Sequence, residues 1–310
     1  MATRTSRVGV VGLGIMGSAI AGHLLRGGYR VIGYDVLEDR RDAHRRAGGA
    51  TASSAREVAG ESSVVISSLP SSDALLRTAA ELRRAPRRPR VVVETSTLPV
   101  AVKEKARRTL AAAGTILLDC PLSGTGAQAR TKDIVVYASG DRAAWRGVVL
   151  IARTFSRAQY YVGPFGSASK LKFVANLLVA VHNVAAAEAL VLARQAGLDP
   201  AMVLEAVSDG AGSSRVLQLR GPMMVAGDYS AATMKLEVWK KDMGIIADFA
   251  RGVGAPTPLF TASAAIYEAA LDMGYHQEDT AAVCAVLQAM AKRPGRRRGG
   301  SRAAARAGVR

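Results

Sequence analysis

The chain has 310 residues and 49% of them are hydrophobic, so it is long enough for about two domains and too apolar for a disordered protein. Its net charge is +17, with much of the excess in residues 83–90 and 293–310. Neither stretch has interleaved aromatic side chains, which favours a solvated loop and a loose tail and disfavours nucleic-acid binding. Cys120 and Cys284 are far apart, which disfavours a zinc site or a disulfide framework and indicates a reducing cytoplasm.

Short apolar runs alternate with helical patterns through the first half of the chain. The runs predict strands over 8–11, 30–34, 63–68, 90–94, 115–119 and 134–138. The patterns between them predict helices over 16–25, 40–47, 74–82 and 100–113. Strands that alternate with helices indicate parallel βαβ units, so we expect an α/β, doubly wound sheet.

The pattern changes after about Gly163, where strand signals end and Ala- and Leu-rich helical patterns begin. Helices are predicted over 170–196, 201–207, 234–251, 258–273 and 279–292, and Gly197 and Pro200 end the first of them. The predicted organisation is an α/β domain over 1–164, an all-α C-terminal domain over 165–292 and a disordered basic tail over 293–310.

A glycine-rich turn lies between the first predicted strand and the first predicted helix. It fits the pattern G-x-G-x-x-G with the residues Gly12-Leu13-Gly14-Ile15-Met16-Gly17. In this context the first glycine permits a tight turn, the second lets a pyrophosphate approach, and the third allows close helix–strand packing. The helix N-terminus adds free N–H groups for phosphates. We therefore predict a dinucleotide-binding, Rossmann-type domain.

Asp35 ends the second predicted strand, about 20 residues past the glycines, where a carboxylate can accept the ribose hydroxyls. This favours NAD as the cofactor, because the 2′-phosphate of NADP would meet a negative charge. Two observations leave alternatives open: a strand-end Asp can simply cap the next turn, and the nearby Arg40 and Arg41 could reach a phosphate. Residues 68–71 and 95–97 also follow strands, and either line the same cleft or cap the next helices.

Two apolar stretches of the sequence resemble membrane-associated segments. Arg4 and Arg7 precede an apolar run as in a signal peptide, but the glycine spacing of that run fits the nucleotide-binding turn better. Residues 174–193 are apolar but include Asn176, His182, Asn183 and Glu188. A buried core helix explains them better than a membrane span.

Lys172 and Asn176 are four residues apart at the start of the long predicted helix, so they share one face. Lys170 lies about 200° away, so only one of the two lysines can face a given cleft. Burial would lower the pKa of Lys172, as would Lys241 if it lies close, and this would make an acid/base group. A surface lysine beside a core asparagine fits the spacing equally well.

Four motifs occur in order along residues 7–291. After the glycine turn, residues 119–124 resemble D-x-P-V-S-G, residues 163–176 resemble G-x-x-G-x-G-x-x-x-K-x-x-x-N, and a Lys-Asp pair occupies 241–242. Together they resemble the β-hydroxyacid dehydrogenase family, the 3-hydroxyisobutyrate dehydrogenase-like enzymes. The resemblance implies an enzyme that transfers hydride between NAD(P) and a small β-hydroxyacid. We expect no metal ligands among the site residues.

The resemblance assigns roles to individual residues. Lys172 would exchange a proton with the substrate oxygen and Asn176 would orient the substrate. The substrate carboxylate would be bound by Ser123 and Gly124, next to Thr125. The predicted cofactor contacts outside the glycine turn are Asp35, Leu69, Pro70, Thr97 and Lys241.

The chain departs from the family pattern at three places. Thr125 stands in place of a second glycine, Ala168 in place of the last motif glycine, and Lys132-Asp133 in place of two small residues. The first and third departures lie in or near residues 119–124, which the resemblance implies to be the substrate segment. The resemblance therefore does not identify the hydroxyacid. The apolar helices of the second half predict a homo-oligomer, a dimer or a tetramer.

Two other functions compete with this interpretation. The chain could be a non-catalytic oligomerising or nucleic-acid-associated module that uses the basic tail as an anchor. It could also be an imine or keto reductase, but relatives that reduce imines usually lack the lysine that stands here at Lys172.

Overall fold

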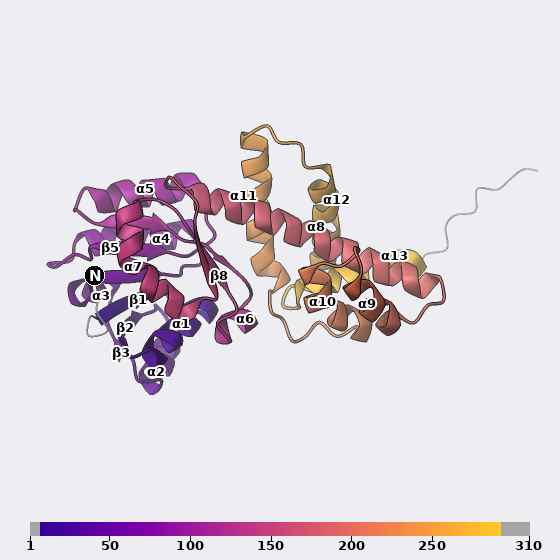
Figure 1. Ribbon diagram of the computed structural model, residues 1–310, viewed down its shortest axis with the longest axis horizontal. Helices are drawn as coiled ribbons and strands as arrows, with labels where there is room; N and C mark the ends of the chain where they lie inside the picture. Colours follow the sequence, from indigo (N-terminus) through magenta and orange to yellow (C-terminus); the bar gives the residue numbers. More distant parts are fainter. Residues whose placement is uncertain (1–6, 293–310) are drawn as a thin grey trace, which may run out of the picture.

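The computed structural model describes residues 7–292, and the predicted basic tail lies outside them. A sheet part and a helical part lie side by side and are joined by one long helix (Figure 1). The main sheet is wholly parallel, with the strand order β3-β2-β1-β4-β5-β6. Its strands are β1 (Arg7–Val11), β2 (Arg30–Tyr34), β3 (Ala50–Thr51), β4 (Val64–Ser67), β5 (Val91–Glu94) and β6 (Ile116–Asp119). This order is that of dinucleotide-binding sheets, so the predicted fold class is confirmed.

Five helices connect these strands: α1 (Ile15–Arg26), α2 (Glu38–Arg46), α3 (Ala55–Glu61), α4 (Ser72–Arg83) and α5 (Val100–Ala111). Both faces of the sheet are covered, because Val8 and Val10 belong to one buried cluster and Val65 and Val92 to another. The central strands are therefore apolar throughout rather than alternating, as expected for a parallel sheet between two helical layers.

A smaller sheet completes the first half of the chain. It consists of β7 (Leu122–Ser123), β8 (Val135–Ala138) and β9 (Ala158–Tyr161), with α6 (Gly126–Arg130) and α7 (Arg142–Phe155) between them. Of these elements, β7, β9, α6 and α7 were not predicted from the sequence, and neither were β3 and α3 of the main sheet. For α7 a signal was present, since Trp145, Val148, Ala152 and Phe155 have helical spacing and are buried.

The helical part is built around α8 (Ser167–Gln195). Around it lie α9 (Pro200–Asp209), α10 (Arg215–Ala226), α11 (Leu236–Gly252), α12 (Pro258–Asp272), a 3-10 turn (Thr280–Ala282) and α13 (Val283–Lys292). The helix α10 was not predicted, because Gly221 and Pro222 interrupt its pattern. Its Ser214 cap and its packing against α8 stabilise it nonetheless.

By length and composition α8 could cross a membrane. Its polar residues show a different environment, because Asn183 donates to the Tyr267 hydroxyl at 2.9 Å and to the Thr280 carbonyl at 2.8 Å. Lys172 and Asn176 are buried on the same helix. Buried polar groups with partners inside the protein are typical of the core helix of a water-soluble fold.

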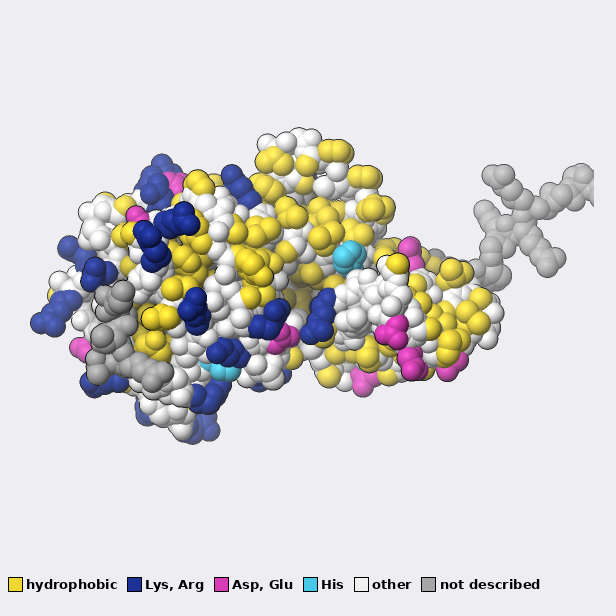
Figure 2. Space-filling model, viewed as in Figure 1, with side chains coloured by type: hydrophobic (Ala, Val, Ile, Leu, Met, Phe, Trp, Pro, Cys, Tyr) yellow, Lys and Arg dark blue, Asp and Glu magenta, His cyan; other side chains and the backbone are white. Residues whose placement is uncertain are grey.

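The charged side chains are distributed unevenly. Lys and Arg side chains gather over the sheet part, and several Asp and Glu side chains lie over the helical part (Figure 2). The arginines of the segment between α4 and β5 are exposed: Arg83, Arg84, Arg87, Arg88 and Arg90. This loop precedes β5, so it lies at the amino ends of the parallel strands. The glycine turn and the predicted cleft lie at their carboxyl ends, so the loop does not line the cleft.

Candidate active site

The glycine turn lies where the strand order reverses, between β1 and β4. Gly12 has a φ of +90°, and a Cβ there would be 2.1 Å from the Ser68 carbonyl oxygen. A Cβ on Gly17 would lie 1.8 Å from the Gly12 carbonyl oxygen. Around Gly14 the nearest atom to an added Cβ is Arg40 Nη1, at 3.6 Å. The three glycines thus have the tight, open and close-packed environments that the motif predicts.

The start of α1 fits an anion. Gly14 is its N-cap, and no side chain caps the free N–H groups of the first turn. No acidic residue lies in that turn either. The glycine turn, residues 12–17, forms a cradle next to this helix end (the glycine cradle). Free N–H donors and a positive dipole end beside such a cradle suit the pyrophosphate of a dinucleotide.

Asp35 directly follows β2 and lies against this turn. Its Oδ2 accepts from the Leu13 N–H at 2.7 Å, and its Oδ1 accepts from the Leu37 N–H at 3.0 Å. Arg40 Nη1 lies 3.3 Å from Oδ2. The carboxylate therefore holds the glycine turn in place, caps the following turn and places a negative charge beside the cradle.

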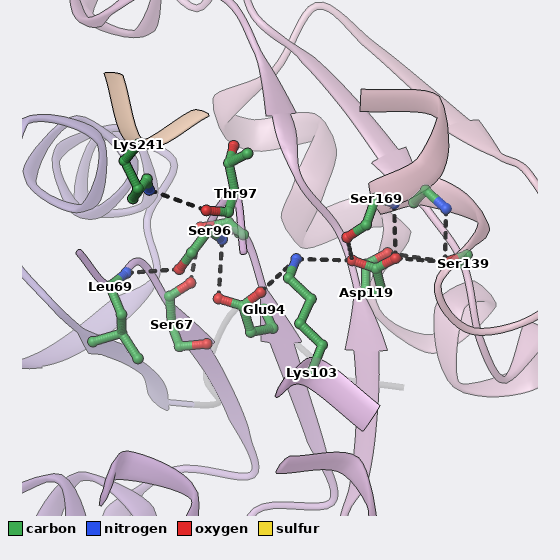
Figure 3. A network of polar contacts seen from close by, with 12 residues as sticks. Ser67, Leu69, Glu94, Ser96, Thr97, Lys103, Asp119, Ser139, Ser169 and Lys241 are labelled. Carbon is green, nitrogen blue, oxygen red and sulfur yellow. Dashed lines mark hydrogen bonds and ion pairs between the residues drawn. The ribbon is translucent and has the colours of Figure 1, made fainter. Parts of the chain in front are cut away.

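Of the other predicted cofactor residues, Leu69 and Thr97 lie just after the carboxyl ends of β4 and β5 (Figure 3). The Leu69 N–H donates to Ser96 Oγ at 2.8 Å, and Lys241 Nζ of α11 donates to the Thr97 carbonyl at 3.0 Å. Pro70 is exposed next to Leu69. The structure thus brings Lys241, 144 positions further along the chain, to the predicted cleft.

The predicted substrate segment forms β7 and the turn after it. Gly124 has a φ of +137°, and a Cβ there would lie 2.7 Å from Ile134 Cγ2, so the position requires glycine. Thr125 caps α6 in a capping box with Gln128. A Cβ on Gly126 would lie 2.3 Å from Ile15 Cγ2, so this turn directly adjoins the cofactor turn.

The departure at Lys132-Asp133 forms part of an ion-pair cluster. Lys132 has a φ of 65°, uncommon for a residue other than glycine. Asp133 accepts from Gln128 Nε2 at 3.1 Å, from Arg157 Nε at 2.8 Å and from Arg215 Nη2 at 3.4 Å. Because Arg215 begins α10, the cluster links the substrate turn to the helical part.

Lys172 lies three residues after Ser169, whose N–H donates to Asp119 at the end of β6, and α8 as a whole also contacts β7 and β8. Its side chain is only 8% exposed, whereas Lys170 is exposed, as the helical spacing predicts for one lysine of the pair. Burial lowers the pKa of Lys172 to about 8, against the opposing effect of the Asp242 carboxylate. Lys241 is not among the groups that shift this pKa; the charged neighbour that does is Asp242, and it acts in the opposite direction to burial.

Asn176 donates from Nδ2 to Asp242 Oδ2 at 3.2 Å, which explains how a buried amide is satisfied in an apolar helix. Burial raises the pKa of Asp242, although Lys241 and Lys172 oppose this. Lys241 was predicted to belong to the site, but Asp242 was not. The sequence signal for Asp242 was the Lys-Asp pair: Lys241 Nζ donates to the Thr97 carbonyl and lies 3.4 Å from Asp242 Oδ1, while Asp242 Oδ2 accepts from Asn176.

A parallel sheet of this order, a glycine cradle and a buried lysine of lowered pKa define a dinucleotide-dependent oxidoreductase of the two-part type. Family models agree with both parts. The model for the NAD-binding domain of 6-phosphogluconate dehydrogenase matches residues 7–163. The model described as the NAD-binding domain of NADP-dependent 3-hydroxyisobutyrate dehydrogenase matches residues 166–287.

Curated relatives match over nearly the whole chain. L-threonate dehydrogenase of Cupriavidus necator is 30% identical over 284 residues, 90% of this chain and 95% of that protein. 2-(Hydroxymethyl)glutarate dehydrogenase of Eubacterium barkeri is 27% identical over 93% of this chain and 96% of that protein.

Solved structures show the same fold. The 3-hydroxyisobutyrate dehydrogenase of Salmonella typhimurium matches with a TM-score of 0.80 and 29% identity, over 91% of this chain and 99% of that one. The Mycobacterium tuberculosis 3-hydroxyisobutyrate dehydrogenase, solved with L-serine, matches with a TM-score of 0.83 and 25% identity, over 92% and 99%. The chain belongs to the β-hydroxyacid dehydrogenase family, and it is an NAD(P)-dependent hydroxyacid dehydrogenase.

Proposed function

We propose that the chain oxidises a small, 3-hydroxyisobutyrate-like β-hydroxyacid with NAD as the preferred cofactor and with Lys172 as general acid/base. The observation that carries this proposal is a lysine of pKa about 8, buried on α8, the helix that contacts β7 of the substrate segment. A lysine with that pKa can take up or release a proton near neutral pH, which an ordinary surface lysine cannot.

Binding and orientation come from the two segments that meet here. Ser123 Oγ and the Gly124 N–H would donate to the substrate carboxylate; the φ of +137° and the close approach of Ile134 hold the backbone of Gly124 in this turn. Asn176, held by Asp242, has its amide oxygen left to accept from a substrate hydroxyl. The bound substrate would thus have its carboxylate at β7 and its hydroxyl at α8.

The proton step belongs to Lys172. In the oxidation direction its neutral amine takes the proton of the substrate hydroxyl, while the C–H hydride leaves the same carbon and a carbonyl forms. NAD(P), when bound, supplies the hydride acceptor. In the reverse direction the ammonium returns the proton to the carbonyl oxygen. Burial helps in both directions, because it keeps the two forms of Lys172 close in free energy at neutral pH.

A substrate panel tests the proposal. The panel contains 3-hydroxyisobutyrate, L-threonate, 2-(hydroxymethyl)glutarate and L-serine, each with NAD and with NADP, and the readout is absorbance of the reduced nicotinamide. We expect turnover with at least one member that carries a hydroxyl on the carbon β to its carboxylate. No turnover of any panel member with either cofactor would contradict the proposal.

Cofactor preference is a separate prediction. Because the Asp35 carboxylate lies beside the cradle, we expect kcat/KM to be higher with NAD than with NADP by about tenfold or more, or ~1.4 kcal/mol. Asp35→Asn removes the charge and should narrow that ratio. Asp39→Asn, on the exposed side of α2, should leave it unchanged. A wild-type preference for NADP would contradict this prediction and would mean that Arg40 rather than Asp35 determines the cofactor preference.

We also propose that the enzyme is a cytoplasmic homo-oligomer, paired through its helical part. Val174, Leu178 and Leu192 of α8 are 48–70% exposed, an apolar surface that a second copy could cover. Sedimentation at micromolar concentration should give a dimer or a tetramer. A monomer under those conditions would contradict the pairing.

A further inference from the structure

A buried carboxylate ties the two halves of the site together (Figure 3). Asp119 is the last residue of β6 and is fully buried. Its Oδ1 accepts from Lys103 Nζ at 2.9 Å and from Ser169 Oγ at 2.7 Å. Its Oδ2 accepts from the Ser169 N–H at 2.9 Å and from Ser139 Oγ at 3.1 Å. Each carboxylate oxygen of Asp119 thus accepts two hydrogen bonds from within the protein, so neither has a lone pair left for a substrate.

These bonds replace the cap that α8 lacks. Its N-cap is Gly166, in the left-handed region with a φ of 90°, and no local side chain caps the helix. The Ser169 N–H goes instead to Asp119, and the Ala168 N–H goes to Ser139 Oγ at 3.1 Å. The first turn of α8 is therefore capped by Asp119 at the end of β6 and by Ser139 just after β8, 50 and 29 positions earlier in the chain.

Lys103 of α5 holds this carboxylate in its charged form. Its Nζ also lies 2.7 Å from Glu94 Oε2, an ion pair without hydrogen-bond alignment, and all three side chains are 0% exposed. Burial alone would lower the pKa of Lys103, but Asp119 and Glu94 outweigh it and raise this pKa above its usual value. Burial would likewise raise the pKa of Asp119, but Lys103 and the Ser169 bonds lower it.

The same cluster reaches the cofactor side of the cleft. Glu94 Oε1 accepts from the Ser96 N–H at 2.9 Å, and Ser96 Oγ accepts from the Leu69 N–H at 2.8 Å. A continuous set of polar contacts therefore runs from the loop after β4 through Lys103 to the first turn of α8 (Figure 3).

We propose that Asp119, held by Lys103, is a positioning residue that sets α8, and with it Lys172, against the substrate segment. Asp119 begins the segment that carries Ser123 and Gly124, and Ser169 precedes Lys172 by three residues on the same helix face. One carboxylate thus fixes both groups that must meet at the substrate. This inference rests on the proposed role of Lys172, but the capping contact itself can be tested without turnover.

Three variants test it. Asp119→Asn keeps the shape of the side chain but replaces one of its two acceptor oxygens by an amide donor, which then faces either the Ser169 N–H or Lys103 Nζ. Lys103 stays paired with Glu94. Ser169→Ala removes only the hydroxyl contact, and Ser169→Thr restores a hydroxyl. Ser167→Ala, in the same helical turn but without a bond to Asp119, is the matched control.

Two readouts separate positioning from stability. For Asp119→Asn and Ser169→Ala we expect kcat to fall about 10- to 100-fold while the KM for the cofactor stays within about twofold, since a misplaced Lys172 lowers the rate but not dinucleotide binding. Ser169→Thr should recover most of the rate, and Ser167→Ala should match the wild type. A wild-type kcat in correctly folded Asp119→Asn, or equal losses in Ser169→Thr and Ser169→Ala, would overturn the proposal.

Amide hydrogen exchange gives the second readout. In Asp119→Asn the first-turn amides of α8 should exchange about fivefold faster, the effect of losing one helix cap. Unchanged exchange would overturn the capping contact. If instead the wild type has no turnover on the substrate panel but these amides do exchange faster, the proposed function fails while the cap stands.

Discussion

Lys172→Ala is expected to lower kcat by about 100- to 10,000-fold, the range that a positioned general acid/base contributes. Dinucleotide affinity should stay within about twofold, because the glycine cradle and the first turn of α1 belong to a different part of the fold. Lys170→Ala is the matched control: this residue lies two positions away, on the exposed side of α8, and its loss should leave kcat unchanged. Wild-type turnover by Lys172→Ala would remove this lysine from the mechanism.

Replacing Lys172 should raise the free energy of unfolding although it lowers activity. The pKa of Lys172 is about 8 in the folded protein, below its usual 10.5, so between these values the unfolded chain binds a proton that the folded chain does not. Stability therefore rises with pH across that window, and below pH 8 the protein carries the full cost of a buried ammonium. Lys172→Met should remove a cost of up to about 3 kcal/mol at pH 7 and raise Tm. A lowered Tm would mean that the lost activity of Lys172 variants reflects unfolding.

Gly17→Ala should have the second large effect, on cofactor binding. An added Cβ would lie 1.8 Å from the Gly12 carbonyl oxygen, so α1 must move away from the turn that holds the pyrophosphate. Overpacking of this kind costs about 1–3 kcal/mol, and if that cost falls on the bound form it weakens dinucleotide binding about 5- to 150-fold.

Gly22→Ala, in the same helix, is the control for this change. The nearest atom to a Cβ there is Arg26 Nη1 at 3.4 Å, the end of a flexible side chain. Alanine also favours helix over glycine, so Gly22→Ala should bind NAD(P) normally and unfold at the same or a slightly higher temperature. Normal binding by Gly17→Ala, measured by fluorescence titration with NADH, would contradict the geometry of the cradle.

The parallel sheet and the cofactor turn could be predicted from local patterns. The strands are short apolar runs, and the glycines stand at fixed spacing after the first of them. Elements whose signals are broken were missed: α10 contains Gly221 and Pro222, and β7 is only two residues long. Packing against α8 and β8 stabilises these elements, and no local pattern reports that packing.

The candidate site could be predicted only in part, because some of its contacts join segments that are distant in the sequence. Lys172 and Asn176 share a helix, so their spacing placed them together. The groups that tune and hold them come from distant segments: Asp242 from α11, Asp119 from β6 and Lys103 from α5. A buried ammonium such as Lys103 has no pattern of its own, because its sequence neighbours Glu104 and Lys105 belong to an ordinary charged helix face.

The pH dependence of kcat/KM for hydroxyacid oxidation tests the central claim most directly. We predict that kcat/KM rises with pH through one ionisation near 8 and is level above it, because only the neutral amine of Lys172 can accept the hydroxyl proton. In Asp242→Asn the ionisation should move to lower pH, since the carboxylate that favours the ammonium is lost. A profile that is flat between pH 6 and 10, or an ionisation at the ordinary lysine value of 10.5, would contradict the account.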